Sequence, residues 1–256
     1  MRDKDIIKRN FSRYAAVYDK YADIQQICGG ELIDTLKTGE FSRILEIGCG
    51  TGNFTRLLRK RFPRASILAM DISPEMIKVA KSKLKGCDID FVTGDGEIID
   101  HEESFDLIGS NASFQWFHDL RGLLEKYYSY LATEGMILFS LFGPGTFYQL
   151  HHSLKKLFGE ETRINSGLFP EYFKIKIMLE SLFGRTEIKR KLYKEKHASL
   201  SGLLHKIKYT GTRGKGVIAA GGLWNSRKIY ELEKIYIDEF KEIITDYEVF
   251  FCKIIK

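Results

Sequence analysis

The sequence predicts an α/β fold in which helices flank both faces of a doubly wound, mostly parallel sheet. Three observations favour this fold. Short apolar segments alternate with helical ones between residues 43 and 142, a glycine-rich turn follows the first apolar segment, and the first four apolar segments end beside polar residues. Strands that alternate with helices are typical of parallel sheets, whose connecting helices cover the faces.

The composition is that of a globular protein. Of 256 residues, 44% are hydrophobic and 29% are charged, which excludes collagen, low-complexity disorder and a disulfide-rich miniprotein. We interpret residues 1–256 as a single domain. Four cysteines without a C-x-x-C pair indicate reduced thiols and no metal site. The charged start and the lack of a membrane-length apolar run predict a cytoplasmic protein without a membrane partner.

The first half of the chain contains the predicted core. Residues 1–36 carry apolar side chains at helical spacing, and we expect N-terminal lid helices there. Within the core, residues 37–142, the expected strands are 43–47, 66–71, 89–92, 105–110 and 136–142, and the expected helices are 53–62, 74–84 and 120–131. Ser73 before Pro74 is a typical helix start.

The alternation breaks after Gly143, where we expect helical cap insertions near the ligand edge of the sheet. Residues 143–225 are interpreted as cap elements plus a late strand, with helices at 146–157, 172–182 and 200–209 and the strand at 186–196. Residues 226–256 add a closing helix at 229–243 and a closing strand at 247–254. The expected sheet therefore has seven strands.

The segment Glu46-Ile-Gly-Cys-Gly-Thr-Gly52 is a candidate ligand-binding turn, because it follows a strand and opens a helix. Glycines there allow the backbone to approach a ligand closely, although a plain structural turn is the alternative. The carboxylate of Glu46 disfavours a pyrophosphate and suits a ligand with an ammonium group. The expected binding residues in this turn are Glu46, Gly48, Cys49, Gly50, Thr51 and Gly52.

Polar residues also follow the next three strands. Asp71, beside Ile72, ends the second strand, where a carboxylate accepts hydrogen bonds from ribose hydroxyls; the alternative is a helix cap. Asp95, beside Gly96, follows the third strand and is placed to accept from an adenine amino group, unless Asp-Gly is an ordinary turn. Asn111 follows the fourth strand and is expected to line the same pocket.

Taken together, these residues resemble the class I S-adenosylmethionine-dependent methyltransferases, which have a Rossmann-like sheet. In that family the glycine turn packs against the methionine moiety, the second-strand acid holds the ribose and the third-strand Asp reads adenine. Further segments resemble malonyl-acyl-carrier-protein O-methyltransferases of biotin synthesis. These segments are Asn10–Asp19, Ser113–Leu120, Phe139–Leu150, Leu204–Gly211 and Thr245–Phe251.

The resemblance implies S-adenosylmethionine as methyl donor, no metal, and a malonyl thioester as acceptor, on acyl-carrier protein or on coenzyme A. The methyl ester that forms would prime pimeloyl synthesis. A carboxylate is ionised at pH 7 and needs no general base, so positioning is the main task. Tyr18, Gln115 and Trp116 are the positioning candidates, with core packing as the alternative for Trp116. A cation should orient the substrate carboxylate, but the sequence does not identify it.

Positive charge is concentrated in the second half of the chain. Residues 1–150 have a net charge of −2 and residues 151–256 a net charge of +8, and Arg185–Lys215 alone holds ten basic and two acidic residues. An acidic carrier protein would fit this segment, with a solvated face or nucleic acid as the alternatives. The expected docking residues are Lys189, Arg190, Lys191, Lys206 and Lys208. The loop Thr212–Gly216 is more basic than the resemblance implies.

Three other functions stay open: a small-molecule carboxylate methyltransferase, an RNA methyltransferase and a non-catalytic binding module. The RNA reading is disfavoured because Asn111-Ala-Ser-Phe114 replaces the N-P-P-Y-type sequence that grips a flipped amino base, and because no RNA-binding module is appended. We therefore expect no nucleic-acid partner.

Overall fold

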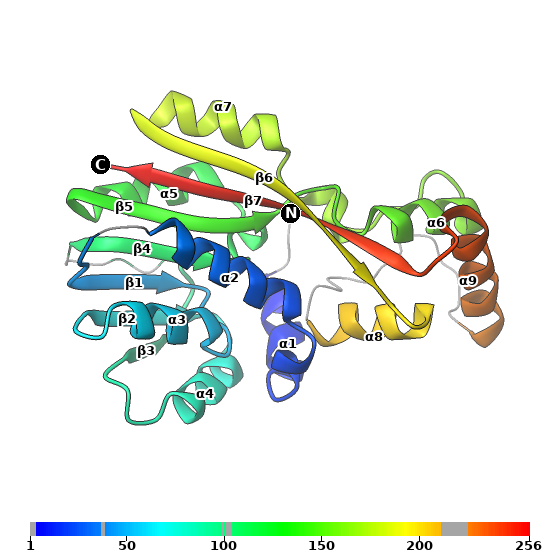
Figure 1. Ribbon diagram of the computed structural model, residues 1–256, viewed down its shortest axis with the longest axis horizontal. Coiled ribbons are helices and arrows are strands. Elements are labelled where there is room, and N and C mark those ends of the chain that lie inside the picture. The colour runs from blue at the N-terminus through cyan, green and yellow to red at the C-terminus, as the bar shows by residue number, and fades with distance from the viewer. Residues whose placement is uncertain (1–3, 37–38, 99, 101–103, 211–224) are drawn as a thin grey trace.

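The computed structural model describes residues 4–36, 39–98, 100, 104–210 and 225–256. One seven-stranded sheet, in the order β3-β2-β1-β4-β5-β7-β6, contains strands from both halves of the chain (Figure 1). Its strands are β1 Arg43–Ile47, β2 Ser66–Asp71, β3 Asp90–Thr93, β4 Phe105–Asn111, β5 Leu131–Phe142, β6 Arg185–Lys196 and β7 Ile244–Ile255. The predicted seven-stranded, doubly wound sheet is confirmed.

The helices between the strands also follow the predicted order. The α-helices are α1 Lys4–Tyr14, α2 Asp23–Thr35, α3 Asn53–Arg61, α4 Pro74–Lys83, α5 Leu120–Ser129, α6 Tyr148–Phe158, α7 Tyr172–Leu182, α8 Leu200–Tyr209 and α9 Ser226–Phe240. Short 3-10 helices are η1 Tyr18–Lys20, η2 Phe114–Trp116 and η3 Asn165–Leu168. Ser73 caps α4 as predicted, because its side chain accepts a hydrogen bond from the Met76 N–H.

The first five strands are parallel, so their carboxyl ends meet at one edge of the sheet. The last strand in the sequence, β7, runs antiparallel to both β5 and β6. As a result β7 begins at the edge where β5 ends. The sequence therefore places five loops and the start of β7 around one region of the molecule.

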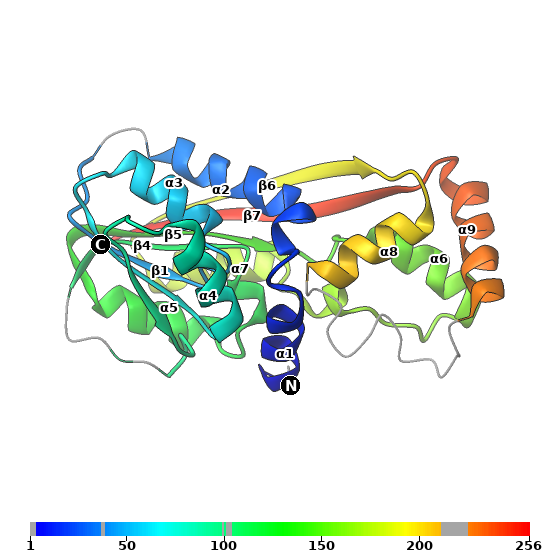
Figure 2. The ribbon, with the colours of Figure 1, turned by 90° about the horizontal axis from the view of Figure 1, so that it is seen from below.

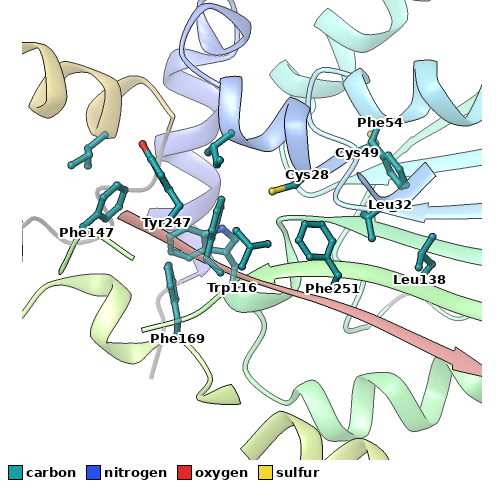
Figure 3. Packing of buried hydrophobic residues seen from close by; sticks show 14 of the residues in the cluster. Cys28, Leu32, Cys49, Phe54, Trp116, Leu138, Phe147, Phe169, Tyr247 and Phe251 are labelled. Carbon is teal, nitrogen blue, oxygen red and sulfur yellow. The ribbon is translucent and has the colours of Figure 1, made fainter. Parts of the chain in front are cut away.

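Apolar side chains alternate between the two faces of the sheet, as expected for strands that are covered on both sides. On one face, Leu138 and Phe251 pack with α2 and α3, whose Leu32 and Phe54 are visible in Figure 3. On the other face, neighbouring strand residues such as Phe139 pack with α5 and α7. The period of two along the strands is thus satisfied by helices on both sides.

Two expectations about the helices need correction. The region we interpreted as cap includes α7, but Ile175 and Leu179 of this helix are buried in the cluster on the sheet face. A spacing of four residues places both side chains on one side of the helix, which explains why α7 covers the sheet. The predicted helix 120–131 ends at Ser129, since Leu131 already pairs with Phe105 as the first residue of β5.

The remaining cap elements lie at one end of the sheet. The β6 and β7 strands, 12 residues each, extend past the other strands and reach α6, α8 and α9 (Figures 1 and 2). In Figure 2, α1 lies between α4 and the group formed by α6, α8 and α9. The expected loop at 212–216 lies outside the described residues. Within the ranges described, no helix has the length and apolar character needed to cross a bilayer.

Candidate functional site

A pocket lies at the carboxyl edge of the parallel strands, with about 740 Å³ of empty volume including its open mouth. This volume falls in the range of roughly 300–1,000 Å³ that is typical of small-molecule sites. Nine of the residues singled out from the sequence line it: Tyr18, Gly48, Gly50, Asp71, Ile72, Asp95, Gly96, Asn111 and Trp116. The strand ends therefore bring together residues that are up to about a hundred positions apart in the chain.

The three glycines of the turn have left-handed backbone conformations but different surroundings. Gly48, Gly50 and Gly52 have φ angles of +72°, +55° and +82°. A Cβ at Gly48 would clash with Ser113, and one at Gly52 would press on Ala80 of α4. A Cβ at Gly50 would meet nothing within 4 Å. Because Gly50 also lines the pocket, this open space is where a ligand can approach the backbone.

Asp71 connects two turns at the floor of the pocket. Its Oδ2 accepts a hydrogen bond from the Gly50 N–H at 2.9 Å, and its Oδ1 accepts one from the Ser73 N–H at 2.8 Å. Burial raises the pKa of Asp71 to about 6, although both hydrogen bonds oppose this shift. The carboxylate is thus already ordered before any ribose hydroxyl reaches it.

Four residues of the predicted cofactor set do not line the pocket. Glu46 is 1% exposed, its Oε2 has no hydrogen-bond partner in the described part of the chain, and burial raises its pKa to about 8. Cys49 and Thr51 are also buried, and Gly52 packs against α4. These four residues therefore do not contact the pocket. Of the residues in this tight turn, Gly48 and Gly50 line it.

Thr51 has a different partner, which lies in the N-terminal segment. Asp19 accepts hydrogen bonds from the Thr51 hydroxyl at 2.5 Å and from the Asn53 side chain at 2.9 Å, and it forms an ion pair with Lys83 at 2.5 Å. These contacts fasten η1 to the start of α3 and the end of α4. The adjacent Tyr18 is thereby held over the pocket.

At the far end of the pocket, Lys4 of α1 binds Asp95. The Lys4 Nζ lies 2.5 Å from the Asp95 Oδ2 and is also paired with Glu97, while the Asp95 Oδ1 accepts from the Glu97 N–H at 3.0 Å. Lys4 itself lines the pocket. Sequence reasoning missed Lys4, because nothing in the local pattern distinguishes it from Lys8, the other lysine of α1.

Aromatic side chains close the pocket between these two ends. The Phe11 ring lies 6.3 Å from that of Tyr18 and 5.9 Å from that of Trp116, both edge-on. Phe11 itself lines the pocket. Burial raises the pKa of Tyr18, so its hydroxyl stays neutral. Together these rings form an aromatic wall of the pocket.

The structure separates Asn111 from Gln115. The Asn111 Nδ2 donates to the Gln25 carbonyl at 2.8 Å and its Oδ1 accepts from the Ser140 hydroxyl at 2.8 Å, while Asn111 still lines the pocket. Gln115 is fully buried outside the pocket and its Nε2 donates to the Ala112 carbonyl at 2.7 Å. Gln115 therefore shapes the turn after β4 and does not contact a ligand in this arrangement.

The five expected docking residues do not all lie on the surface. Lys206 was wrongly assigned, because it is only 7% exposed and pairs with Asp23 at 2.7 Å and Glu195 at 2.5 Å. The other four lie at least partly on the surface. Arg190 pairs with the buried Glu248 and Lys191 with Glu31. Lys208 lies over tyrosine rings, and Lys189 is exposed. Lysines on β6 also protect an edge strand from pairing with other chains.

Comparison with known proteins finds similarity both to a protein family and to solved structures. A family described as methyltransferase domains matches residues 44–135. The N-methyltransferase NodS of Bradyrhizobium japonicum, solved with S-adenosyl-L-homocysteine, has a TM-score of 0.56 and 14% identity over 98% of both chains, which shows a shared fold. Among the residues that the structure describes, no group of three or more potential ligands forms a metal site.

Relatives with higher identity share one name. The malonyl-[acyl-carrier protein] O-methyltransferase of Priestia megaterium is 44% identical over 164 residues, which are 61% of this chain and 60% of that protein. The protein of the same name in Paenibacillus sp. is 34% identical over 96% of both chains. The chain belongs to the malonyl-[acyl-carrier protein] O-methyltransferase family.

Proposed function

We propose that this protein transfers a methyl group from S-adenosylmethionine to the free carboxylate of a malonyl thioester on acyl-carrier protein. The resulting methyl ester would prime biotin synthesis. The observation that carries this proposal is the sequence of groups along one pocket: Asp95, Asp71, the open backbone at Gly50 and then Asn111. The names of the relatives support the choice of acceptor.

The order of polar groups along the pocket supports S-adenosylmethionine as its ligand. Asp95 would accept from the adenine amino group, Asp71 from the ribose hydroxyls, and the turn at Gly50 would face the methionine part. Apolar side chains of Ile72 and Phe117 line the pocket near the adenine end. When bound, the cofactor supplies an electrophilic methyl group on a sulfonium. The proposed binding set omits any metal.

The residues of this chain would act by orienting groups and excluding water. The acceptor carboxylate is ionised at pH 7, so its oxygen would attack the methyl group directly, with the neutral thioether sulfur as leaving group. No proton leaves, and no general base is needed. Opposite charges disappear in this step, so a dry site favours it. Phe11, Tyr18 and Trp116 would provide that dryness.

Carrier-protein docking stays part of the proposal and falls on the surface basic residues, without Lys206. Lys189, Arg190, Lys191 and Lys208 would meet an acidic carrier, and malonyl-coenzyme A is the alternative acceptor that needs no such surface. We propose no nucleic-acid or membrane partner, and a cytoplasmic location.

An acceptor panel tests the proposed activity. With labelled S-adenosylmethionine, we expect the label to appear fastest on malonyl-acyl-carrier protein, more slowly on malonyl-coenzyme A, and least on succinyl-carrier protein and free malonate. Mild alkali should release it, as expected for an ester. Equal rates on free acids would indicate a small-molecule methyltransferase. Cofactor binding without label on any acid would indicate a binding module.

Gly50→Val should abolish binding of S-adenosylhomocysteine, because its side chain would occupy the space where the ligand meets the backbone. Gly86→Val is the matched control, since Gly86 has a φ of +83°, also has no atom within 4 Å of an added Cβ, and does not line the pocket. Both variants carry similar backbone strain of about 1–2 kcal/mol. Calorimetric titration should show wild-type affinity for the control, and equal affinities in both variants would contradict the site.

Cofactor affinity should depend on the ionisation of Asp71, whose pKa is about 6 in the ligand-free protein. Ribose hydroxyls donate to the ionised carboxylate, so affinity for S-adenosylhomocysteine should rise about tenfold between pH 5 and pH 7. The free energy of unfolding should fall as the pH rises from about 4 to 6. The reason is that the pKa of Asp71 is higher in the folded protein than in the unfolded chain, so ionisation favours the unfolded state. Asp71→Asn should flatten both profiles, and an unchanged pH profile in this variant would remove the ribose assignment.

Charge reversal at Lys189 and Lys208 should slow use of the carrier substrate. We expect kcat/KM for malonyl-acyl-carrier protein to fall about tenfold at low salt, with a smaller loss at 0.5 M salt, because screening weakens attraction between exposed charges. Turnover of malonyl-coenzyme A should not change. Lys234→Glu, on the exposed side of α9, is the control. If the carrier rate is the same in all three proteins, this surface does not dock the carrier.

A further inference from the structure

A second, smaller cavity lies beside the cofactor pocket. It has an empty volume of about 290 Å³ and is more enclosed than the pocket. Its walls come from α2, the turn after β5, the segment around η3, α8 and the start of β7. The residues that matter here are Gln25, Thr146, Phe147, Phe169, Lys206 and Tyr247.

The two cavities share a wall. Trp116 lines the cofactor pocket and lies edge-on to Phe169 of the second cavity, with ring centres 5.4 Å apart. Asn111 lines the pocket and donates to the carbonyl of Gln25, which lines the second cavity. Figure 3 shows Trp116, Phe169, Phe147 and Tyr247 gathered at one end of the core cluster. A movement of the two rings would join the cavities.

The strand order places the second cavity at the reactive end of the cofactor. Along the sheet edge, Asp95 follows β3, Asp71 ends β2, the glycine turn follows β1 and Asn111 ends β4. Adenine, ribose and the methionine part would therefore lie along β3, β2 and β1 in that order. The next strands are β5 and β7, and Thr146 and Tyr247 bring them to the second cavity. An acceptor there would face the methyl group.

The second cavity contains a lysine ammonium. Among the described residues that line the two cavities, the cations are Lys4 and Lys206, and Lys4 lies at the Asp95 end. A lysine ammonium has three donors, and two of those of Lys206 go to Asp23 and Glu195. These carboxylates fix its position, and its third donor has no partner among the described residues.

Two further observations indicate a ligand in this cavity. Gln25 is only 8% exposed, and its buried Oε1 has no hydrogen-bond partner among the residues that the structure describes. Buried acceptors of this kind are rare unless something else satisfies them. Phe147 has a φ of +63°, a costly conformation for a bulky residue that is typically retained at functional sites.

We infer that the second cavity receives the acyl group of the acceptor and that Lys206 orients its carboxylate toward the cofactor pocket. This inference rests on the proposed function and assigns the cation that carboxylate methylation requires. Lys206 is a positioning residue here, whose ammonium holds one carboxylate oxygen while the other meets the methyl group. The amide groups of the thioester arm would supply a donor to Gln25.

Discrimination between charged and neutral acyl groups tests this role. With S-adenosylhomocysteine bound, calorimetric titrations compare malonyl-coenzyme A with propionyl-coenzyme A, which has the same chain length without the carboxylate. Wild type should bind the malonyl form about 10- to 100-fold more tightly, as for a charge-assisted hydrogen bond. In Lys206→Met this preference should fall below about twofold, and in Lys206→Arg it should largely return.

Binding of S-adenosylhomocysteine alone should stay unchanged in these variants, which reports that they are folded. Lys234→Met should keep the full preference. If Lys206→Met does not fold, because Glu195 loses its partner, the double change with Glu195→Gln removes the uncompensated charge. Equal binding of the two thioesters by wild type, or a preference that survives in Lys206→Met, would overturn the inference and leave an ordered water as the content of the cavity. Failure of wild type to bind S-adenosylhomocysteine would instead contradict the proposed function.

Discussion

Five parallel strands that end at one edge are the constraint on which the rest of this molecule depends. Parallel strands have their carboxyl ends at the same edge of the sheet, so residues that follow different strands lie close together there. The antiparallel β7 adds a second consequence, since it must start where β5 ends. Cofactor groups and acceptor groups are thereby arranged along one line, in the order of the strands and not of the sequence.

The N-terminal segment contacts the loops at the carboxyl edge of the sheet at three points. Lys4 pairs with Asp95, Ser12 shares a hydrogen bond with Ser73 at 2.9 Å, and Asp19 holds the start of α3 through Thr51. Each point uses a residue next to, or part of, the predicted cofactor set. The lid is therefore fastened by the same strand-end loops that form the pocket, and closure and cofactor recognition depend on shared polar groups.

Much of the fold and about half of the site follow from local sequence patterns. Apolar alternation located the strands, and a polar residue after each strand located Asp71, Asp95 and Asn111, because strand ends have a fixed place in a parallel sheet. Positions inside a turn were less predictable. Thr51 and Gln115 are adjacent to pocket residues in the sequence but point away from the pocket, since side-chain direction in a turn depends on backbone angles.

Long-range charge partners were the hardest features to predict. Lys4 and Asp95 are 91 residues apart, and no local signal links them. Lys206 was counted with a basic segment although it lies beside the buried stripe of Leu203 and Ile207 on α8. The helical spacing of Lys206 relative to Leu203 and Ile207 could have predicted its burial, but the assignment was based on the net charge of the segment. Charge counts describe a segment, whereas burial of one lysine depends on which side of its helix meets the core.

A crystal structure of the protein with S-adenosylhomocysteine and malonyl-coenzyme A would show whether cofactor and acceptor groups lie along the sheet edge in the order of the strands. We predict adenine at Asp95, ribose at Asp71, the sulfur between Gly48 and Asn111, and the malonyl carboxylate between that sulfur and Lys206. An acyl group that approached the sulfur from any other side, with the cavity beside Lys206 left to solvent, would contradict the arrangement along the sheet edge.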